Sequence, residues 1–304
     1  MKKQTKAYLL ALLAVLFWST IASALKISLR YISFELLLFY SATIATLFLF
    51  ALLAAQNRLK EAFHITRKEY IRSAVLGFLN PFIYYMGLLK AYDMLRAQEA
   101  GTLNYIWPLI LALLSIPVLK QKIPWQSIFA ILISFSGLVI ISTRGRVLEM
   151  QFEEPLGVAL ILISAVIWAS YWLINMKDKR QVIPKLFLNF LFGIAYAFVY
   201  LTASGKLALP NVNGLLGSLW VGIFELGLTF VIWLRALGLS SNTAKVSQLV
   251  YLSPFISLFF IQFIVKETIV FPTIVGLILI IAGIMLQQYL DQKERKANRL
   301  SKKY

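Results

Sequence analysis

Long runs of apolar residues, separated by short charged or Gly- and Pro-containing breaks, dominate the pattern along this 304-residue chain. A run of about 18 or more apolar residues is typical of a transmembrane helix, because about 20 residues cross the hydrocarbon core of a bilayer. Ten runs are predicted to span a membrane, at residues 8–25, 34–54, 71–89, 97–118, 123–142, 156–175, 185–204, 214–234, 244–265 and 270–290. The sequence therefore predicts an all-α integral membrane protein with ten transmembrane helices and no sizeable soluble domain.

The first run could also be interpreted as a secretory signal peptide. It follows the segment MKKQTK and reaches the small residues Ala22, Ser23 and Ala24 near its end. The run is long for the apolar part of such a signal, and a matching segment occurs later in the chain. We therefore expect it to remain as the first transmembrane helix.

Lysine and arginine are distributed unevenly between the two sets of loops. If the N-terminus is cytoplasmic, 22 of the 30 Lys and Arg residues lie on the cytoplasmic side and 8 lie outside. Because cytoplasmic loops are enriched in basic residues, both termini are predicted to be cytoplasmic. The net charge of +17 then reflects topology and contact with anionic lipid headgroups, and no nucleic-acid partner is expected.

Matching residues recur in the two halves of the chain, 145 to 150 positions apart. The segment around Trp18 matches the one around Trp168, and the mid-span Pro108 matches Pro254. Small residues match in the same order, Ala130 and Gly137 with Gly276 and Gly283, and they favour close helix packing, with a dimer face as the alternative. The chain is therefore interpreted as a duplication.

Each half contains five predicted spans, an odd number, so the second half must enter the membrane from the opposite side. Such inverted-topology repeats are typical of secondary transporters, in which the substrate binds near the membrane midplane between the halves. We predict a first five-helix repeat at residues 1–147, a second, inverted repeat at 148–290 and a basic cytoplasmic tail at 291–304.

Pro108 and Pro254 are expected to interrupt their spans at matching positions. Proline lacks an N–H and clashes with the carbonyl four residues earlier, which here belongs to Asn104 or Val250. Interrupted helices inside a membrane face protein or a wet cavity. We predict a hinge role for both prolines, the alternative being a simple kink in each span.

Aromatic and polar residues at mid-span positions are the candidates for a substrate cavity. Trp18 and Trp168 lie about ten residues deep, near the bilayer centre at about 1.5 Å per residue, although tryptophan ordinarily prefers the interface. Rings with hydrogen-bonding tips suit an amphipathic organic molecule; the alternative is that they only fill space between helices. The candidate cavity residues are Trp18, Ser19, Asn80, Tyr84, Asn104, Tyr105, Trp107, Trp168, Tyr171, Gln248 and Tyr251.

Two glutamates within the predicted spans are candidates for coupling transport to an ion. Glu225 lies midway along its span, where charge is costly, and it could either take up a proton or neutralise a nearby basic group. Glu99, near the outer end of its span, could shuttle a proton or meet a substrate amino group. Its alternative role is that of a carboxylate stabilising a helix start. Protons are the candidate coupling ion.

The composition argues against enzymatic chemistry. With no Cys and one His, thiolate chemistry and any site that needs two histidines are excluded. No G-x-x-x-x-G-K-[ST] motif occurs and no Asp lies in a predicted span. We expect no enzyme activity, cofactor or metal. A channel remains an alternative, without a charged ring or a carbonyl-filter motif to support it.

These features together resemble the drug/metabolite transporter superfamily, in its ten-helix EamA-type branch. The string Glu99-Ala100-Gly101-Thr102-Leu103-Asn104-Tyr105-Ile106-Trp107-Pro108 is similar to a motif of the aromatic amino acid exporters within it. The likeness covers residues 7–290 and is closest to YddG-type aromatic amino acid exporters, which have segments similar to Phe17-Trp18-Ser19-Thr20 and Trp168-Ala169-Ser170-Tyr171. The family pattern of a mid-span proline with an acid thirteen residues later is met by Pro254 and Glu267, whereas Gln121 follows Pro108. The resemblance implies export of amino acids or related metabolites by alternating access.

These features together predict a secondary transporter of the bacterial inner (cytoplasmic) membrane. It is expected to export small amphipathic metabolites around a midplane cavity, amino acids first and aromatic ones among them. The alternatives are uptake or exchange of a sugar conjugate, nucleotide conjugate or drug-like cation, and a channel-like pore. A small-molecule substrate and membrane lipid are the expected partners, and the protein is expected to be a monomer.

Overall fold

The computed structural model describes residues 3–119, 127–148, 154–240, 246 and 248–301, and this part of the chain is all-helical. Its first half comprises α1 (Lys3–Ser28), α2 (Phe34–Ala55), α3 (Leu59–Phe63), α4 (Arg67–Gly77), the π-helical turn η1 (Phe78–Ile83), α5 (Tyr84–Met94), α6 (Ala97–Asn104), α7 (Trp107–Leu119) and α8 (Ser127–Ser142). Its second half comprises α9 (Pro155–Met176), α10 (Val182–Ala203), α11 (Val212–Trp220), the π-helical turn η2 (Val221–Gly227), α12 (Leu228–Leu239), the 3₁₀ turn η3 (Gln248–Leu252), α14 (Ser253–Phe260), the π-helical turn η4 (Ile261–Val265) and α15 (Phe271–Ser301).

Many of these helices are long and apolar enough to cross a membrane. Within the described residues there are seven such helical stretches and two shorter apolar ones, Ile128–Ser142 and Leu249–Val265. The seven are Lys3–Ser28, Phe34–Ala55, Arg67–Met94, Pro155–Asn175, Val182–Ala203, Val212–Leu239 and Phe271–Leu290. The protein is therefore a multi-pass membrane protein.

The predicted span at 97–118 consists of two helices, and the interruption lies directly before Pro108. Helix α6 ends at Asn104 and α7 begins at Trp107. The amides of Tyr105 and Ile106 close tight turns on carbonyls three residues earlier. Pro108 lies in the first turn of α7, where its missing N–H has no intrahelical partner to lose. Pro254 likewise lies in the first turn of α14, directly after η3, so each matching proline follows a helix interruption.

Two further predicted spans are also interrupted near their middle. In the stretch Arg67–Met94 the turn η1 contains Pro81, and Asn80 before it has the extended backbone angles φ −147° and ψ 120°. In the stretch Val212–Leu239 the turn η2 ends at Gly227, which is also outside the helical region. The two halves therefore each contain a second interrupted span.

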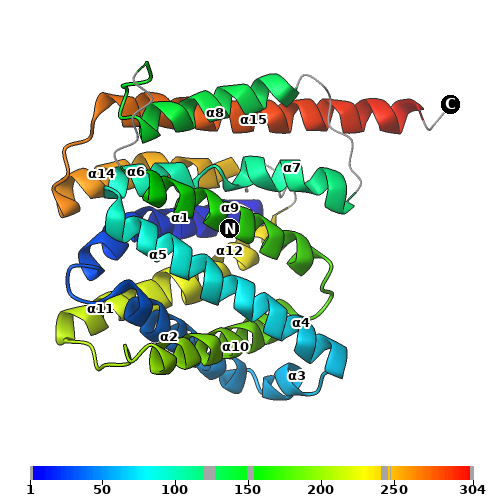
Figure 1. The fold of residues 1–304 in the computed structure, drawn as a ribbon. Helices are drawn as coiled ribbons and strands as arrows, with labels where there is room; N and C mark the ends of the chain where they lie inside the picture. Colours follow the sequence, from blue (N-terminus) through cyan, green and yellow to red (C-terminus); the bar gives the residue numbers. More distant parts are fainter. Residues whose placement is uncertain (1–2, 120–126, 149–153, 241–245, 247, 302–304) are drawn as a thin grey trace.

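The helices pack in a pattern that repeats between the halves. Helix α1 packs against α12 and α14, and α9 packs against α5 and α7. We refer to these sets as the α1 group (α1, α12, α14) and the α9 group (α5, α7, α9). Helix α2 contacts η2, α10 contacts η1, and α2 and α10 pack on each other. In Figure 1, α8 and α15 form a pair at the top of the view, and α2 and α10 lie at the opposite end with the two groups between them.

Glycines set the close approach of α8 and α15. A Cβ atom added to Gly276 would lie 2.7 Å from the Gly137 carbonyl oxygen, and one added to Gly137 would lie 2.5 Å from the Gly276 carbonyl oxygen. A Cβ atom on Gly283 would lie 2.5 Å from the Ala130 carbonyl oxygen. No larger side chain fits at such distances, so these four small residues pack the two helices together within one chain.

Candidate functional site

Trp168, near the middle of α9, is the hub of a buried aromatic cluster. Its indole ring stacks on Tyr84 of α5, with centroids 4.7 Å apart, and on Tyr171, at 5.7 Å. It meets Trp172 edge-on at 5.7 Å and Phe230 of α12 at 6.3 Å. Offset stacking and edge contacts are the favoured arrangements of aromatic rings, so the cluster is well packed around Trp168.

The cluster extends from the α9 group into the α1 group. Trp18 of α1 lies 5.9 Å from Phe230 and 5.3 Å from Trp233, measured between ring centroids. We define the aromatic cluster as Trp18, Tyr84, Tyr85, Trp168, Tyr171, Trp172, Phe230 and Trp233. Because rings from both helix groups meet there, the cluster lies at the junction between them.

Glu225 adds a carboxylate beside this cluster. It lies in η2, and the hydroxyl of the fully buried Tyr85 donates a hydrogen bond of 2.9 Å to its Oε1. Tyr85 in turn contacts Tyr84, with ring centroids 4.7 Å apart. Within the described residues Glu225 forms no ion pair, so the structure gives no support there to a charge-neutralising role.

Polar side chains from the interrupted helices lie next to the aromatic cluster. Ser19 of α1 is completely buried, and its hydroxyl lies 3.2 Å from that of Ser253, directly before Pro254. The Tyr105 hydroxyl lies beside Ser253, and Asn104 lies beside Tyr84. Residues flanking both broken spans therefore converge on the same region as the aromatic cluster.

Several buried polar atoms near the cluster have no hydrogen-bond partner among the described residues. The Tyr171 hydroxyl lies beside the amides of Asn80 and Asn189 without forming a regular hydrogen bond to either. The unpartnered atoms here are Asn80 Oδ1, Asn104 Oδ1, Tyr171 Oη, Trp172 Nε1, Asn175 Oδ1 and both polar atoms of the Asn189 side chain. A buried polar group without a partner costs about 1–3 kcal/mol, so this concentration is typical of a site that binds a polar ligand or solvent.

A cavity of about 270 Å³ adjoins the cluster at one end of α9 and α10. Phe230 and Trp172 give it aromatic walls, while Asn175, Asp178 and Lys185 bring polar and charged groups to its lining. Its full lining is Tyr171, Trp172, Asn175, Asp178, Val182, Lys185, Leu186 and Phe230. Apolar walls with a few polar groups are typical of small-molecule sites.

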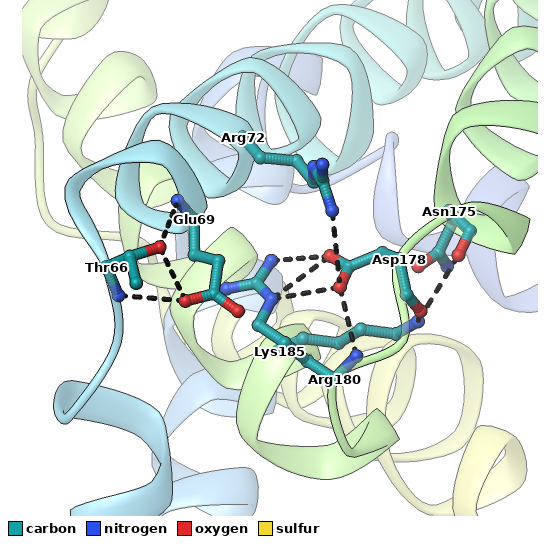
Figure 2. A network of polar contacts seen from close by, with 7 residues as sticks. All are labelled: Thr66, Glu69, Arg72, Asn175, Asp178, Arg180 and Lys185. Atoms are coloured by element: carbon teal, nitrogen blue, oxygen red, sulfur yellow. Dashed lines mark hydrogen bonds and ion pairs between the residues drawn. The ribbon is translucent and has the colours of Figure 1, made fainter.

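A network of charges surrounds Asp178 at the mouth of this cavity (Figure 2). The nearly buried Asp178 carboxylate accepts hydrogen bonds from Arg180, the shortest 2.6 Å long, and lies 3.8 Å from the Arg72 guanidinium of α4. Lys185 Nζ donates to the Asp178 carbonyl oxygen at 3.1 Å and lies 3.4 Å from that of Asn175. Three cations around one carboxylate leave the mouth with a net positive charge.

We predict that Asp178→Asn lowers the stability of the protein and removes part of its acid sensitivity. Burial alone would raise the pKa of Asp178, but the hydrogen bonds and charge of Arg180 outweigh it and hold the pKa below its ordinary value. The stabilisation is therefore present at neutral pH and lost as the pH falls through this lowered pKa. Thermal unfolding in detergent should show a loss of about 3 kcal/mol at pH 7. The exposed pair of Lys90 and Asp93 provides the control, since Asp93→Asn should cost less than about 1 kcal/mol.

The remaining predicted residues lie outside the aromatic cluster. Trp107 packs on the hydrophobic core at the start of α7, and Tyr251 accepts a hydrogen bond from Gln288 of α15. The side chain of Gln248 is outside the part of the molecule that the structure describes. Glu99 forms an ion pair with Arg144 and a capping interaction at the start of α6, as its alternative role as a helix-start carboxylate predicts.

Several lining residues were not among the sequence-predicted candidates. Asn175 lies on one face of α9 with Trp168, Tyr171 and Trp172, at the i, i+3, i+4 and i+7 spacing that places side chains together on a helix. That spacing could have identified it. Asn189, Phe230 and Lys185 carry no comparable signal, because their approach depends on how α10 and α12 pack against α9.

Comparison with known proteins gives matches over nearly the whole chain. The sequence model described as the EamA-like transporter family matches twice, at residues 5–143 and 155–287. An uncharacterised transporter of Clostridium kluyveri is 26% identical over 61% of this chain, although the match spans only 60% of that relative. One of Archaeoglobus fulgidus is 22% identical over 92% of this chain and 98% of its own length. A solved crystal structure superposes with a TM-score of 0.67 at 20% identity, covering 94% of this chain and 98% of the other.

Proposed function

Because the chain belongs to the EamA-like transporter family, in the drug/metabolite transporter superfamily, we propose that it is a secondary transporter that exports small amphipathic metabolites, amino acids first. The observation that carries this proposal is the cavity of about 270 Å³ that adjoins the aromatic cluster. Tyr171, Trp172 and Asn175, each of which has a buried polar atom without a partner among the described residues, are among its lining residues. Such a site holds a molecule with one apolar and one polar end.

The proposed architecture has ten membrane spans arranged as two inverted repeats. The matching contacts of α1 with α12 and α14, and of α9 with α5 and α7, support this arrangement. So do the two separate matches to one family model, each covering about half of the chain. The helix interruptions before Pro108 and Pro254 then lie at equivalent positions in the repeats, where hinges would allow the two helix groups to move.

The cavity lies at the end of the molecule that the distribution of basic residues assigns to the cytoplasm. Its mouth is formed by the segment between α9 and α10, which is rich in Lys and Arg. Helix α6 packs against α1, α14 and η4, and its first residues belong to the opposite end. A cavity that opens inward and a closed outer end suit loading from the cytoplasm and export across the inner membrane.

An amino acid fits the chemistry of this cavity. Lys185 and Asp178 place charges of both signs at its mouth, and Phe230 and Trp172 offer apolar faces for a side chain. Its volume, slightly below the range of about 300–1,000 Å³ for drug-sized ligands, suits a smaller metabolite. Uptake of a sugar or nucleotide conjugate is the second candidate.

Transport assays with purified protein in liposomes test this function. We expect saturable counterflow of at least one labelled amino acid, with aromatic ones preferred, because the site pairs rings with polar groups. Liposomes that lack the protein define the background. Counterflow of a sugar or nucleotide conjugate alone would reassign the substrate, and single-channel conductance steps without saturation would contradict a transporter.

A further inference from the structure

Two oppositely charged side chains hold the turn between α5 and α6, at the end of the molecule opposite the cavity. Lys26 of α1 reaches this turn with its ammonium group, which donates hydrogen bonds to the carbonyl oxygens of Tyr92 at 2.9 Å and Leu95 at 2.6 Å. Glu267, from the segment between η4 and α15, accepts hydrogen bonds from the amides of Ala97 at 3.0 Å and Gln98 at 3.3 Å. The same turn is therefore bound from both sides.

The charge of each of these two side chains is opposite to the partial charge of the helix end that it contacts. Helix α5 ends at Met94, so the carbonyl groups around it form the negative end of its dipole, where a lysine is favoured. Helix α6 begins at Ala97, and its free amide groups form a positive end, where a carboxylate is favoured. Of the charged groups that act on Lys26, Glu267 attracts it most strongly. The two contacts therefore reinforce each other.

These contacts connect the two helix groups. Lys26 belongs to the α1 group and binds the end of α5, in the α9 group. Glu267 follows η4, which continues α14 of the α1 group, and it binds the start of α6, which leads into α7. The buried Gln98 extends the connection, donating to the Thr268 carbonyl oxygen and accepting from the Val270 amide. Opening this end requires that all these bonds break.

The positions that match Lys26 and Glu267 in the other half of the sequence are uncharged. At the offset that relates Trp18 to Trp168, the residue matching Lys26 is Met176. At the offset that relates Pro108 to Pro254, the residue matching Glu267 is Gln121. Lys26 of the first repeat and Glu267 of the second therefore have no charged counterparts at the matching positions, and the cytoplasmic end carries a different charge network, the one around Asp178.

We propose that Lys26 and Glu267 form an ionic latch that keeps the outer end closed and holds the resting protein in the cytoplasm-facing state. This inference rests on the proposed transport function and adds a direction to it. Contacts that form only when the outer end is closed lower the free energy of the cytoplasm-facing state relative to the outward-facing state. Without substrate, the transporter therefore mainly populates the state in which its cavity is accessible from the cytoplasm. Opening toward the outside requires that the contacts of Lys26 and Glu267 break.

The absence of cysteine allows a direct test with a single reporter thiol. Ser23 is buried and lies between Lys26 and Ser19 on the same face of α1, at i, i+4 and i+7 spacing. In the Ser23→Cys protein, we expect slow labelling by a membrane-impermeant maleimide added from outside. Adding Lys26→Met or Glu267→Gln should raise the labelling rate at least tenfold, because the outer end then opens more often.

Two control variants separate a latch from general loosening. Lys90→Met removes a lysine that pairs with Asp93 of the same helix, and it should leave the labelling rate unchanged. Lys26→Arg keeps the charge and should preserve most of the protection, which also covers the case in which Lys26→Met fails to fold. Unchanged labelling in folded Lys26→Met and Glu267→Gln proteins would overturn the latch, and so would an equal increase in Lys90→Met.

The labelling needs no substrate, so it separates this inference from the proposed function. Faster labelling in the latch variants without transport of any metabolite would support the latch and contradict the transport assignment. Transport by the wild-type protein with unchanged labelling of the latch variants would support the transport assignment and contradict the latch.

Discussion

Glu225→Gln should reduce proton-driven flux at least tenfold and remove its dependence on pH. Glutamine has nearly the same shape as glutamate, and its carbonyl oxygen can still accept the hydrogen bond from Tyr85. The substitution therefore removes the site that a proton could occupy while the local packing is retained. Flux into liposomes with an imposed pH gradient, measured from about pH 6 to pH 8, shows the effect.

Counterflow distinguishes loss of coupling from loss of binding. If Glu225 carries only the proton, counterflow of labelled substrate by the Glu225→Gln protein should continue at a rate close to that of the wild type. Tyr85→Phe is the matched control, because it removes the hydrogen bond and leaves the carboxylate in place. Proton-driven flux that persists in Glu225→Gln would exclude this residue as the coupling site.

Trp168→Ala should bring transport to background. The substitution removes the ring that stacks on Tyr84 and Tyr171 and leaves a cavity in the aromatic cluster. Trp168 is partly buried, so its removal should cost about 3 kcal/mol, the lower end of the range for a large aromatic side chain. Counterflow and thermal unfolding should therefore be measured on the same preparation, so that flux is normalised to folded protein.

Trp168→Phe separates substrate contact from stability. Phenylalanine retains a ring, so the protein should remain folded, while the smaller surface and the lost N–H should raise the KM for counterflow about tenfold. Trp220→Ala is the control, since Trp220 is 41% exposed and lies outside the aromatic cluster. If transport by the folded Trp168→Ala protein equalled that of the wild type, the cluster would not be the substrate site.

The helical class of the fold follows from hydropathy, but the interruptions of the helices follow only in part. The breaks before Pro108 and Pro254 were predictable because proline blocks a helical hydrogen bond wherever it occurs. The interruption at Gly227 was not, because nothing in the surrounding apolar sequence distinguishes it from an ordinary helix interior. In the structure a Cβ atom on Gly227 would lie 3.0 Å from the ring of Phe48, a contact that depends on packing against α2.

The residues of the candidate site were likewise predictable only in part. Trp18, Trp168 and Tyr84 were found because depth along a span can be counted from the sequence, and the structure brings them together. Tyr251 is a tyrosine like Tyr84 and lies at a similar depth along its span, yet it contacts α15 and not the aromatic cluster. Depth does not fix the direction in which a side chain points, because that depends on the rotation of each helix. The contacts of Lys26 with Leu95 and of Glu267 with Ala97 were not predictable either, because they join residues about 70 and 170 positions apart in the sequence.

The pairing of α8 with α15 affects how the chain is made. Helix α8 is complete at Ser142, but its glycine-lined partner begins only at Phe271. At about 5–20 residues per second, a ribosome needs on the order of ten seconds to synthesise the residues between them. During that time the small-residue face of α8 at Gly137 is without the helix that packs on it. This pairing therefore forms late, and a chain that stops before Phe271 leaves α8 without its partner.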